Sequence, residues 1–114
     1  MVPPSLAAAL DAFARGVPAE ALPSFADDAT YAEAGKPPVC GRAGIAAEFA
    51  RFAASGVPFR FVVEDAIVDG NRACVEYRFA VATGAGGAWR ERAGCATVRF
   101  DHRGHIEEWR EYEG

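Results

Sequence analysis

The chain has 114 residues and a formal net charge of −4, which comes from 12 Lys and Arg residues and 16 Asp and Glu residues. This length suits one domain spanning residues 1–114 and is too short for two. The sequence contains no basic run and no long apolar stretch, so we expect binding neither to nucleic acid nor to a membrane. The first residues lack the regions of a signal peptide, and we therefore expect a soluble, cytoplasmic protein.

Three helices are predicted in the first half of the chain. Gly16 stands where the first helix should end, and Pro18 suits the first turn of a second, short helix. A third helix is expected over residues 42–55. The apolar stripes at helical spacing are Leu6, Ala9, Leu10 and Phe13 in the first helix, Leu22 and Phe25 in the second, and Ile45, Phe49 and Phe52 in the third.

The rest of the chain alternates apolar and polar residues, which is typical of strands. A short strand is expected over residues 29–33, and the Gly- and Pro-rich segment 34–38 is predicted to be a loop. Tight turns then separate four longer strands, and this series predicts an antiparallel meander. The four strands are expected to start near Phe59, Cys74, Cys95 and Ile106.

One face of this sheet is apolar, and the three amphipathic helices are the cover available for it. Because a long sheet curls, we predict an α+β fold. In it, three N-terminal helices pack on a strongly curved antiparallel sheet and form a cone around an apolar pocket. Alternation sends Tyr77 and Phe79 to the inner face and Glu76 and Arg78 to the outer face. No Lys or Arg is then expected on the inner face.

The sequence shows no motif for a metal ion or a cofactor. Cys40, Cys74 and Cys95 are odd in number and lack the two-residue spacing of zinc and redox sites. His102 and His105 flank a turn and supply too few ligands for a metal ion. Neither a phosphate-binding loop nor a dinucleotide fingerprint occurs. We therefore expect thiols without a disulfide framework, no metal site and no cofactor.

Three segments carry a resemblance to a known family. Residues 25–31 (FADDATY) resemble the helix-to-first-strand segment of SnoaL-like proteins, and residues 41–45 (GRAGI) resemble the start of their third helix. Residues 104–112 (GHIEEWREY) are similar to their final strand. Over nearly its whole length the chain thus resembles the SnoaL-like and ketosteroid-isomerase-like branch of the nuclear-transport-factor-2-like superfamily. That superfamily contains isomerases, cyclases, epoxide hydrolases and non-catalytic modules, so the resemblance implies the cone fold without naming one function.

The resemblance to the steroid isomerases is partial at the residues that do the chemistry. In those enzymes a first-strand carboxylate shuttles the proton, and Glu33 stands at that position. Their oxyanion hole comes from a helix-one tyrosine and a fourth-strand aspartic acid, but Ala9 and Ala96 stand at those positions in this sequence. We therefore expect no steroid isomerisation by that mechanism.

The resemblance to limonene epoxide hydrolase is also partial. The positions that hold the water in that enzyme are occupied here by Tyr31, Glu33 and Glu111. Its third-strand arginine and aspartate align with Tyr77 and Phe79. A shift of one residue presents Arg78 and Ala80 instead, and the acid that protonates the epoxide is missing either way.

Tyr31, Glu33 and Glu111 are the candidate catalytic residues, and each has a structural alternative. Glu33 is either a general base whose pKa is raised by burial from about 4.3, or a solvated carboxylate beside the Gly-Pro loop. Glu111 shares strand parity with Trp109. It either joins Glu33 as an acid–base partner or belongs to a solvated acidic strip at the end of the chain. Tyr31 either hydrogen-bonds a ligand or water, or places its hydroxyl at the surface.

The remaining inward positions are expected to bind the ligand. They come from the first and third helices and from the four longer strands, and their side chains are apolar or aromatic. They are Phe13, Phe49, Phe52, Phe61, Val63, Tyr77, Phe79, Ala96, Val98 and Trp109.

Two functions fit these residues. The first is a small enzyme that uses carboxylate acid–base chemistry on a small apolar or oxygenated molecule, by isomerisation, cyclisation or epoxide hydration. The second is a non-catalytic module that binds a small ligand or serves in dimeric interactions. Related proteins pair through the outer sheet face, so we expect a homodimer through it. That face is too polar for a core and less charged than a solvated face, and it carries Cys74, Glu76, Arg78, Cys95, Thr97 and Arg99.

Overall fold

The computed structural model describes residues 2–84 and 86–114, which form three helices and six strands. The helices are α1 (Pro4–Ala14), the 3₁₀ helix η1 (Pro18–Ser24) and α2 (Arg42–Ala54). The strands are β1 (Phe25–Ala32), β2 (Val39–Cys40), β3 (Phe59–Asp69), β4 (Arg72–Ala82), β5 (Trp89–Phe100) and β6 (Ile106–Glu113). Within these residues no helix is both long and apolar enough to cross a membrane.

The three predicted helices are present, with one boundary misplaced. Pro4 and Pro18 lie in the first turns of α1 and η1, where the missing N–H of proline needs no partner. Gly16 follows α1 with a φ of 77°, the left-handed conformation that commonly ends a helix. Phe25 begins β1 and is fully buried there. Its predicted burial is confirmed, and its predicted place in the second helix is wrong.

The sheet has the strand order β2-β1-β6-β5-β4-β3. From β3 to β6 each strand pairs antiparallel with the next, which confirms the predicted meander. β1 pairs in parallel with β6, so the prediction of a wholly antiparallel sheet is wrong. A parallel pair needs a long crossover connection, and here that connection consists of β2, α2 and the first three strands of the meander.

The two faces of the meander follow the predicted alternation. On β4, Tyr77 is buried on the inner face and Arg78 is exposed on the outer one. The pairing of β3 with β4 shifts between Val63 and Asp65. Such a bulge bends the strand and increases its twist, and it contributes to the curvature of the sheet.

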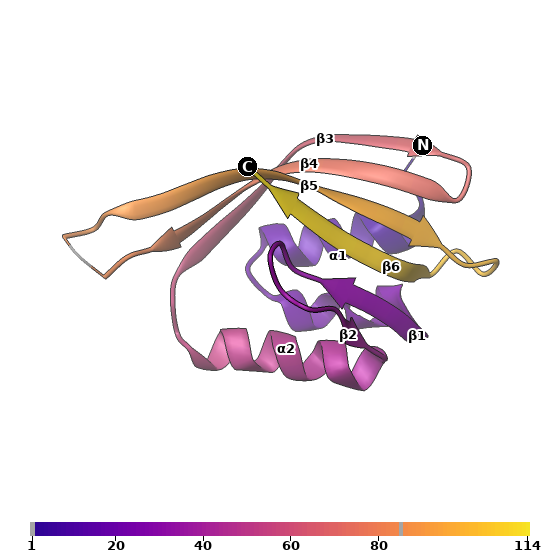
Figure 1. The fold of residues 1–114 in the computed structure, drawn as a ribbon, viewed down its shortest axis with the longest axis horizontal. Helices are drawn as coiled ribbons and strands as arrows, with labels where there is room; N and C mark the ends of the chain where they lie inside the picture. Colours follow the sequence, from indigo (N-terminus) through magenta and orange to yellow (C-terminus); the bar gives the residue numbers. More distant parts are fainter. Residues whose placement is uncertain (1, 85) are drawn as a thin grey trace.

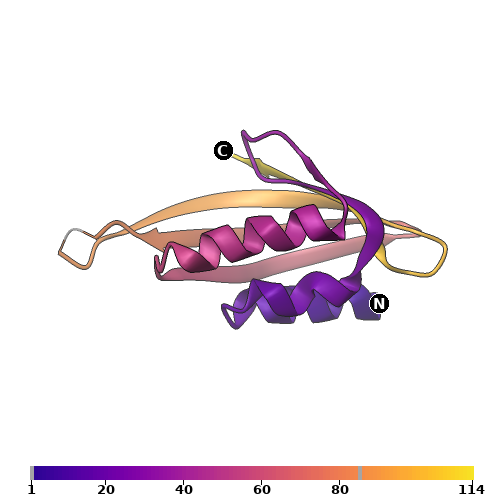
Figure 2. The same ribbon diagram turned by 90° about the horizontal axis from the view of Figure 1, so that it is seen from below.

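The helices cover one face of the sheet and leave part of it open. Figure 1 shows α1 and α2 on the same side of the sheet, and Figure 2 shows α2 lying across its inner face with α1 alongside. In both views the end of the β4–β5 hairpin extends past the helices. The helices therefore cover one end of the curved sheet, the closed end, and leave it uncovered beside this hairpin, at the open end.

The core fills the closed end. Trp109 is fully buried, and the ring of Phe13 meets the rings of Trp109, Phe49 and Phe61 edge-on, with centroids 5.4–5.8 Å apart. Aromatic pairs favour this arrangement because the positive edge of one ring meets the negative face of another. Phe79, which alternation predicts on the inner face, is only partly buried and lies near the end of β4.

Candidate functional site

The wide end of the cone contains a pocket of about 520 Å³, between the helices, the loop after β1 and the inner face of the sheet. The aromatic residues of its lining are Phe13, Tyr31, Phe49, Phe52, Phe59, Phe61, Tyr77 and Phe79. Ionisable side chains of both signs line it as well, so the prediction of an inner face without Lys or Arg is wrong. These are Glu33, Lys36, Glu48, Arg51, Arg90, Arg92, Glu111 and Glu113.

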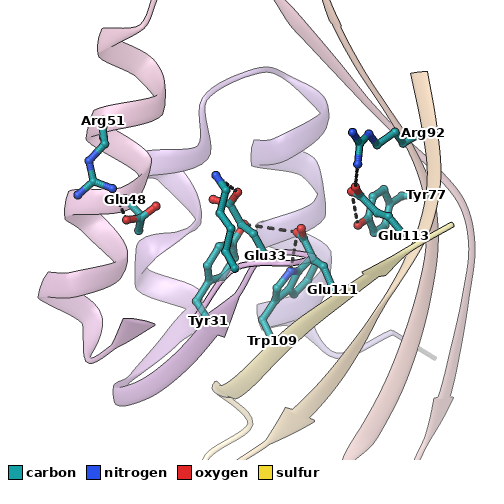
Figure 3. Close-up of polar contacts among 10 residues, drawn as sticks. Tyr31, Glu33, Glu48, Arg51, Tyr77, Arg92, Trp109, Glu111 and Glu113 are labelled. Atoms are coloured by element: carbon teal, nitrogen blue, oxygen red, sulfur yellow. Dashed lines mark hydrogen bonds and ion pairs between the residues drawn. The ribbon is translucent and has the colours of Figure 1, made fainter. Parts of the chain in front are cut away.

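Glu111 is the carboxylate held most firmly inside this pocket. Alternation along β6 points Trp109 and Glu111 inward, and Glu111 lies opposite Ala96 of β5. Trp109 Nε1 donates a hydrogen bond of 2.9 Å to Glu111 Oε2, and the Tyr31 hydroxyl donates a longer one of 3.4 Å to the same oxygen (Figure 3). The parallel pairing of β1 with β6 sets Tyr31 beside Trp109 and so brings all three groups together.

The environment of Glu111 favours its protonated form near neutral pH. Burial is the main cause and raises the pKa of this carboxyl to about 7. The hydrogen bond from Trp109 opposes the rise, and the nearby charges of Glu33 and Glu113 add to it. A carboxyl with this pKa can both accept and return a proton at neutral pH, which suits a general acid–base group.

Tyr31 is a neutral hydrogen-bond donor in this site. Burial and the neighbouring charge of Glu111 raise the pKa of its phenol well above the usual value, so the hydroxyl keeps its proton. Its ring meets Phe49 edge-on and stacks on Trp109. These contacts fix the direction of the hydroxyl, which points into the site rather than out to the surface.

Glu33 lies just past the end of β1, at the margin of the pocket. Its carboxylate forms an ion pair of 3.0 Å with Lys36 Nζ, and its side chain is 34% exposed. Strand alternation predicts no Lys or Arg on the inner face, but it does not account for the loop after β1, which also lines the pocket. Lys36 belongs to that loop, and the turn brings it back over Glu33 through a backbone hydrogen bond between the two residues.

A second carboxylate, Glu113, lies two residues beyond Glu111 on the same face of β6. The hydroxyl of Tyr77 donates a 3.0 Å hydrogen bond to Glu113 Oε2, and Arg92 Nη1 lies 3.7 Å from Oε1. Gly94 stands between them in the register, opposite both Tyr77 and Glu113. A Cβ at this position would lie 2.8 Å from the Tyr77 ring, so only glycine lets the tyrosine lie across β5 to reach Glu113.

The charged residues near the open end of the pocket were not predicted from the sequence. Arg90 and Arg92 share the parity of the inward-facing Ala96 and Val98 on β5. Extending that alternation back to the start of the strand would have placed both arginines inside. On α2, Arg51 forms an ion pair with Glu48, one turn apart on the same side of the helix (Figure 3).

Four of the predicted ligand-binding residues lie outside the pocket lining. Ala96, Val98 and Trp109 are completely or almost completely buried, and Val63 packs against the core. The rings of Phe13 and Phe61 fill the closed end, so these four residues support the pocket from behind. Trp109 contacts the site through the hydrogen bond of its indole to Glu111 and through its ring contacts with Tyr31 and Phe13.

Within residues 2–84 and 86–114, no group of three or more His, Cys, Asp or Glu side chains could hold a metal ion. Cys40, Cys74 and Cys95 are unbridged thiols. The ionisable groups of the pocket lining are carboxylates, tyrosine hydroxyls, arginines and the amine of Lys36.

The family of the chain follows from a match to a family model. The model of the SnoaL-like domain matches residues 6–109. The chain belongs to the SnoaL-like domain family. A comparison with curated proteins found no match.

Several solved structures share this SnoaL-like fold. A protein of ketosteroid isomerase-like fold from Catenulispora acidiphila, in complex with trimethylamine, has a TM-score of 0.82 at 19% identity, over 98% of this chain and 86% of that one. A proposed polyketide cyclase from Xanthomonas campestris has a TM-score of 0.75 at 24% identity, over 96% and 87%. An epoxide hydrolase resembling limonene epoxide hydrolase, from M. tuberculosis, has a TM-score of 0.78 at 22% identity, over 96% and 80%. These likenesses establish the fold.

In this SnoaL-like domain the residues at the positions of the isomerase oxyanion donors belong to the core. Ala9 and Ala96 are both fully buried in the core and offer no polar group to a ligand. Arg78, the residue that a shifted alignment with the epoxide hydrolase would use, faces outward and pairs with Glu64 and Glu91. The polar groups available to a bound molecule are therefore the ones described above.

Proposed function

We propose that this SnoaL-like domain binds a small molecule in its pocket and acts on it by acid–base chemistry, with Glu111 carrying the proton. One observation carries the proposal. Glu111 lies on the pocket wall with Trp109 and Tyr31 hydrogen-bonded to one of its oxygens, and its pKa is raised to about 7. Catalytic carboxylates need a pKa near the working pH.

The geometry fits a proton shuttle better than an epoxide opening. In such a reaction the Glu111 carboxylate takes a proton from a carbon or hydroxyl of the ligand and returns it at another atom of the same molecule. Tyr31, protonated and aimed at Glu111, can donate a hydrogen bond to an oxygen that gains charge. Isomerisation and cyclisation can use these groups, whereas the resemblance to the epoxide hydrolase lacks its third-strand acid, because Phe79 stands at that position.

The second candidate is a module that binds a ligand without changing it. The absence of donors at Ala9 and Ala96 favours this candidate. The similar structure from Catenulispora acidiphila contains trimethylamine, and aromatic rings with carboxylates are also suited to an organic cation. The two candidates differ in what loss of the Glu111 carboxylate does, because binding can survive it and proton transfer cannot.

The catalytic proposal can be tested with 5-nitrobenzisoxazole, a general substrate for base-catalysed proton removal, so the natural substrate need not be known. A base that removes the C–H proton of 5-nitrobenzisoxazole breaks its N–O bond and yields a coloured nitrophenolate. We expect the protein to accelerate this elimination along a pH profile with an apparent pKa near 7, and Glu111→Gln to lower the rate about tenfold or more. Glu76→Gln, on the exposed outer face, is the matched control. Equal rates for the wild type and Glu111→Gln would leave the binding module as the function.

We further propose that the domain forms a homodimer through the outer sheet face. Large apolar side chains are exposed on this face at Val62, Ile67, Trp89 and Tyr112. Its charges are largely paired within the chain, since Arg78 and Arg99 each contact two glutamates. A partner therefore meets apolar groups and little net charge, which a second copy of the same face provides.

Sedimentation tests the dimer. The wild type should sediment as a dimer at micromolar concentration, and Ile67→Glu with Tyr112→Glu should convert it to a monomer. Val57→Glu is the control, because Val57 is exposed but lies between α2 and β3. A wild type that stays monomeric at high micromolar concentration would contradict this proposal.

A further inference from the structure

Most charges in the pocket lining are paired with one another. Lys36 pairs with Glu33, Arg51 with Glu48, and Arg92 with Glu113. Two members of the lining have no ion pair among the described residues: Glu111, deep in the pocket, and Arg90, near the open end. The pocket therefore has an acid–base group at one end and an available cation at the other.

Arg90 and Arg92 lie on the same face of β5 as the residue opposite Glu111. Arg92 lies opposite Phe79 and Arg90 opposite Val81, whereas Glu111 lies opposite Ala96. At about 3.3 Å per residue along a strand, the backbone of Arg92 is roughly 13 Å from that of Ala96. The backbone positions of Arg92 and of the residue opposite Glu111 are thus separated by about the length of a small organic molecule, and the Arg92 guanidinium reaches back along the strand toward Glu113.

The wall between these two ends is aromatic except at Glu113, whose carboxylate is already held by Tyr77 and Arg92. Phe61 and Tyr77 stack with ring centroids 4.9 Å apart, and Phe79 continues this wall toward the arginines. Phe52 and Phe59 pack against Phe79 near the same end. A ligand that reaches from the arginines to Glu111 must therefore have an apolar middle.

We propose that the pocket takes an organic carboxylate whose anionic end binds Arg90 and Arg92, whose apolar middle lies along the aromatic wall, and whose reacting end reaches Glu111. This inference rests on the proposed function and names its substrate class. Arginine is suited to the role because its planar guanidinium can bind both oxygens of a carboxylate. Arg90 and Arg92 are binding residues in this account, and Glu111 remains the catalytic residue.

Arg92 can turn to a ligand by giving up one loose contact, and Glu113, whose side chain is 13% exposed, then keeps the Tyr77 hydroxyl as its hydrogen-bond donor. Its contact with Glu113 is loose, at 3.7 Å, and its side chain is 53% exposed. Glu113 also accepts the 3.0 Å hydrogen bond from Tyr77, which remains when Arg92 moves. The interaction of Arg92 with an incoming carboxylate therefore replaces a weak contact, and that of Arg90 replaces only water.

Three probes with one carbon skeleton test this inference, namely 4-phenylbutyrate, 4-phenylbutyramide and 4-phenylbutylamine. Their binding is measured by titration calorimetry at low salt on the full chain. We expect the carboxylate to bind about tenfold more tightly than the amide and the amine more weakly than both. In Arg90→Gln with Arg92→Gln, the carboxylate should bind no better than the amide. Arg110→Gln, on the exposed outer face of β6, should keep the wild-type preference.

The outcomes separate this inference from the proposed function. Equal binding of the carboxylate and the amide to the wild type would overturn it, as would an unchanged preference in the double variant. Tighter binding of the amine would replace the anionic ligand with a cationic one, and no binding of any probe would also count against the inference. The proposed function is judged separately by the elimination of the uncharged 5-nitrobenzisoxazole and its dependence on Glu111.

Discussion

The closed and open ends of the cone are built from the same strands, yet their inner faces hold opposite kinds of side chain. On β5 the inward residues at the closed end are Ala96 and Val98, which are buried, and those at the open end are Arg90 and Arg92, which are exposed. Strand alternation decides which face a side chain occupies. The cover provided by the helices decides whether that face is dry. Glu111 lies at the boundary, where water is scarce and a ligand can still enter.

Removal of an aromatic ring from the closed end should have the largest effect. Phe13 contacts three other rings there, so Phe13→Ala should lower the free energy of unfolding by about 3–5 kcal/mol. Phe59→Ala at the open end is the control and should cost clearly less, since Phe59 is only partly buried. Urea denaturation measures both. Equal losses would remove the distinction between the two ends.

The boundary position of Glu111 should make stability depend on pH. Its pKa of about 7 in the folded protein lies above the ordinary 4.5, so the folded state binds the proton more tightly than the unfolded state. The resulting stabilisation is complete below pH 4.5 and is lost as the pH rises through 7. The loss amounts to about 3 kcal/mol. Glu111→Gln should flatten this dependence and be more stable than the wild type at pH 8. Parallel stability profiles for the two proteins between pH 5 and 8 would contradict the account.

An intermediate effect is expected at Gly94, where the open end is most tightly packed. In Gly94→Ala the new methyl group meets the Tyr77 ring and Glu113, and the displacement should cost about 1–3 kcal/mol. The same substitution in a Tyr77→Ala background should cost much less, because the ring is gone. Denaturation of the four proteins gives the interaction energy. A cost that does not depend on Tyr77 would mean that the ring does not lie across Gly94.

The smallest effect is expected at the rim. Lys36 and Glu33 are both substantially exposed, with Lys36 at 63%, and exposed ion pairs contribute little. Lys36→Gln should therefore change stability by less than about 1 kcal/mol, and high salt should remove most of that. A loss of several kcal/mol in the free energy of unfolding would mean that this ion pair is buried rather than exposed.

Much of the fold could be predicted from the sequence, because periodicity reports local structure directly. The helix stripes, the turns and the register of Tyr77 and Arg78 all follow from spacing and are present in the structure. The parallel pairing of β1 with β6 could not be predicted in this way. This pairing joins the first strand to the last one, and no local sequence pattern predicts which distant strands pair.

The candidate site could be predicted only in part. The parity of Glu111 with Trp109 correctly placed both on the inner face, but spacing does not show which of two inward carboxylates is the drier one. Glu33 has Lys36 as a partner because a loop folds back over it, and Glu111 is desolvated because β1 and the helices cover it. Both outcomes depend on tertiary packing, which cannot be predicted from residue spacing.

The pKa of the Glu111 carboxyl is the measurement that bears most directly on the acid–base proposal. The ¹³C resonances of the glutamate carboxyls can be followed by NMR as the pH is raised, and Glu111→Gln assigns the one that disappears. We expect that resonance to titrate at about 7. A Glu111 carboxyl that titrates below about 5, like an ordinary glutamate, would contradict the assignment of Glu111 as the proton-transfer group of this pocket.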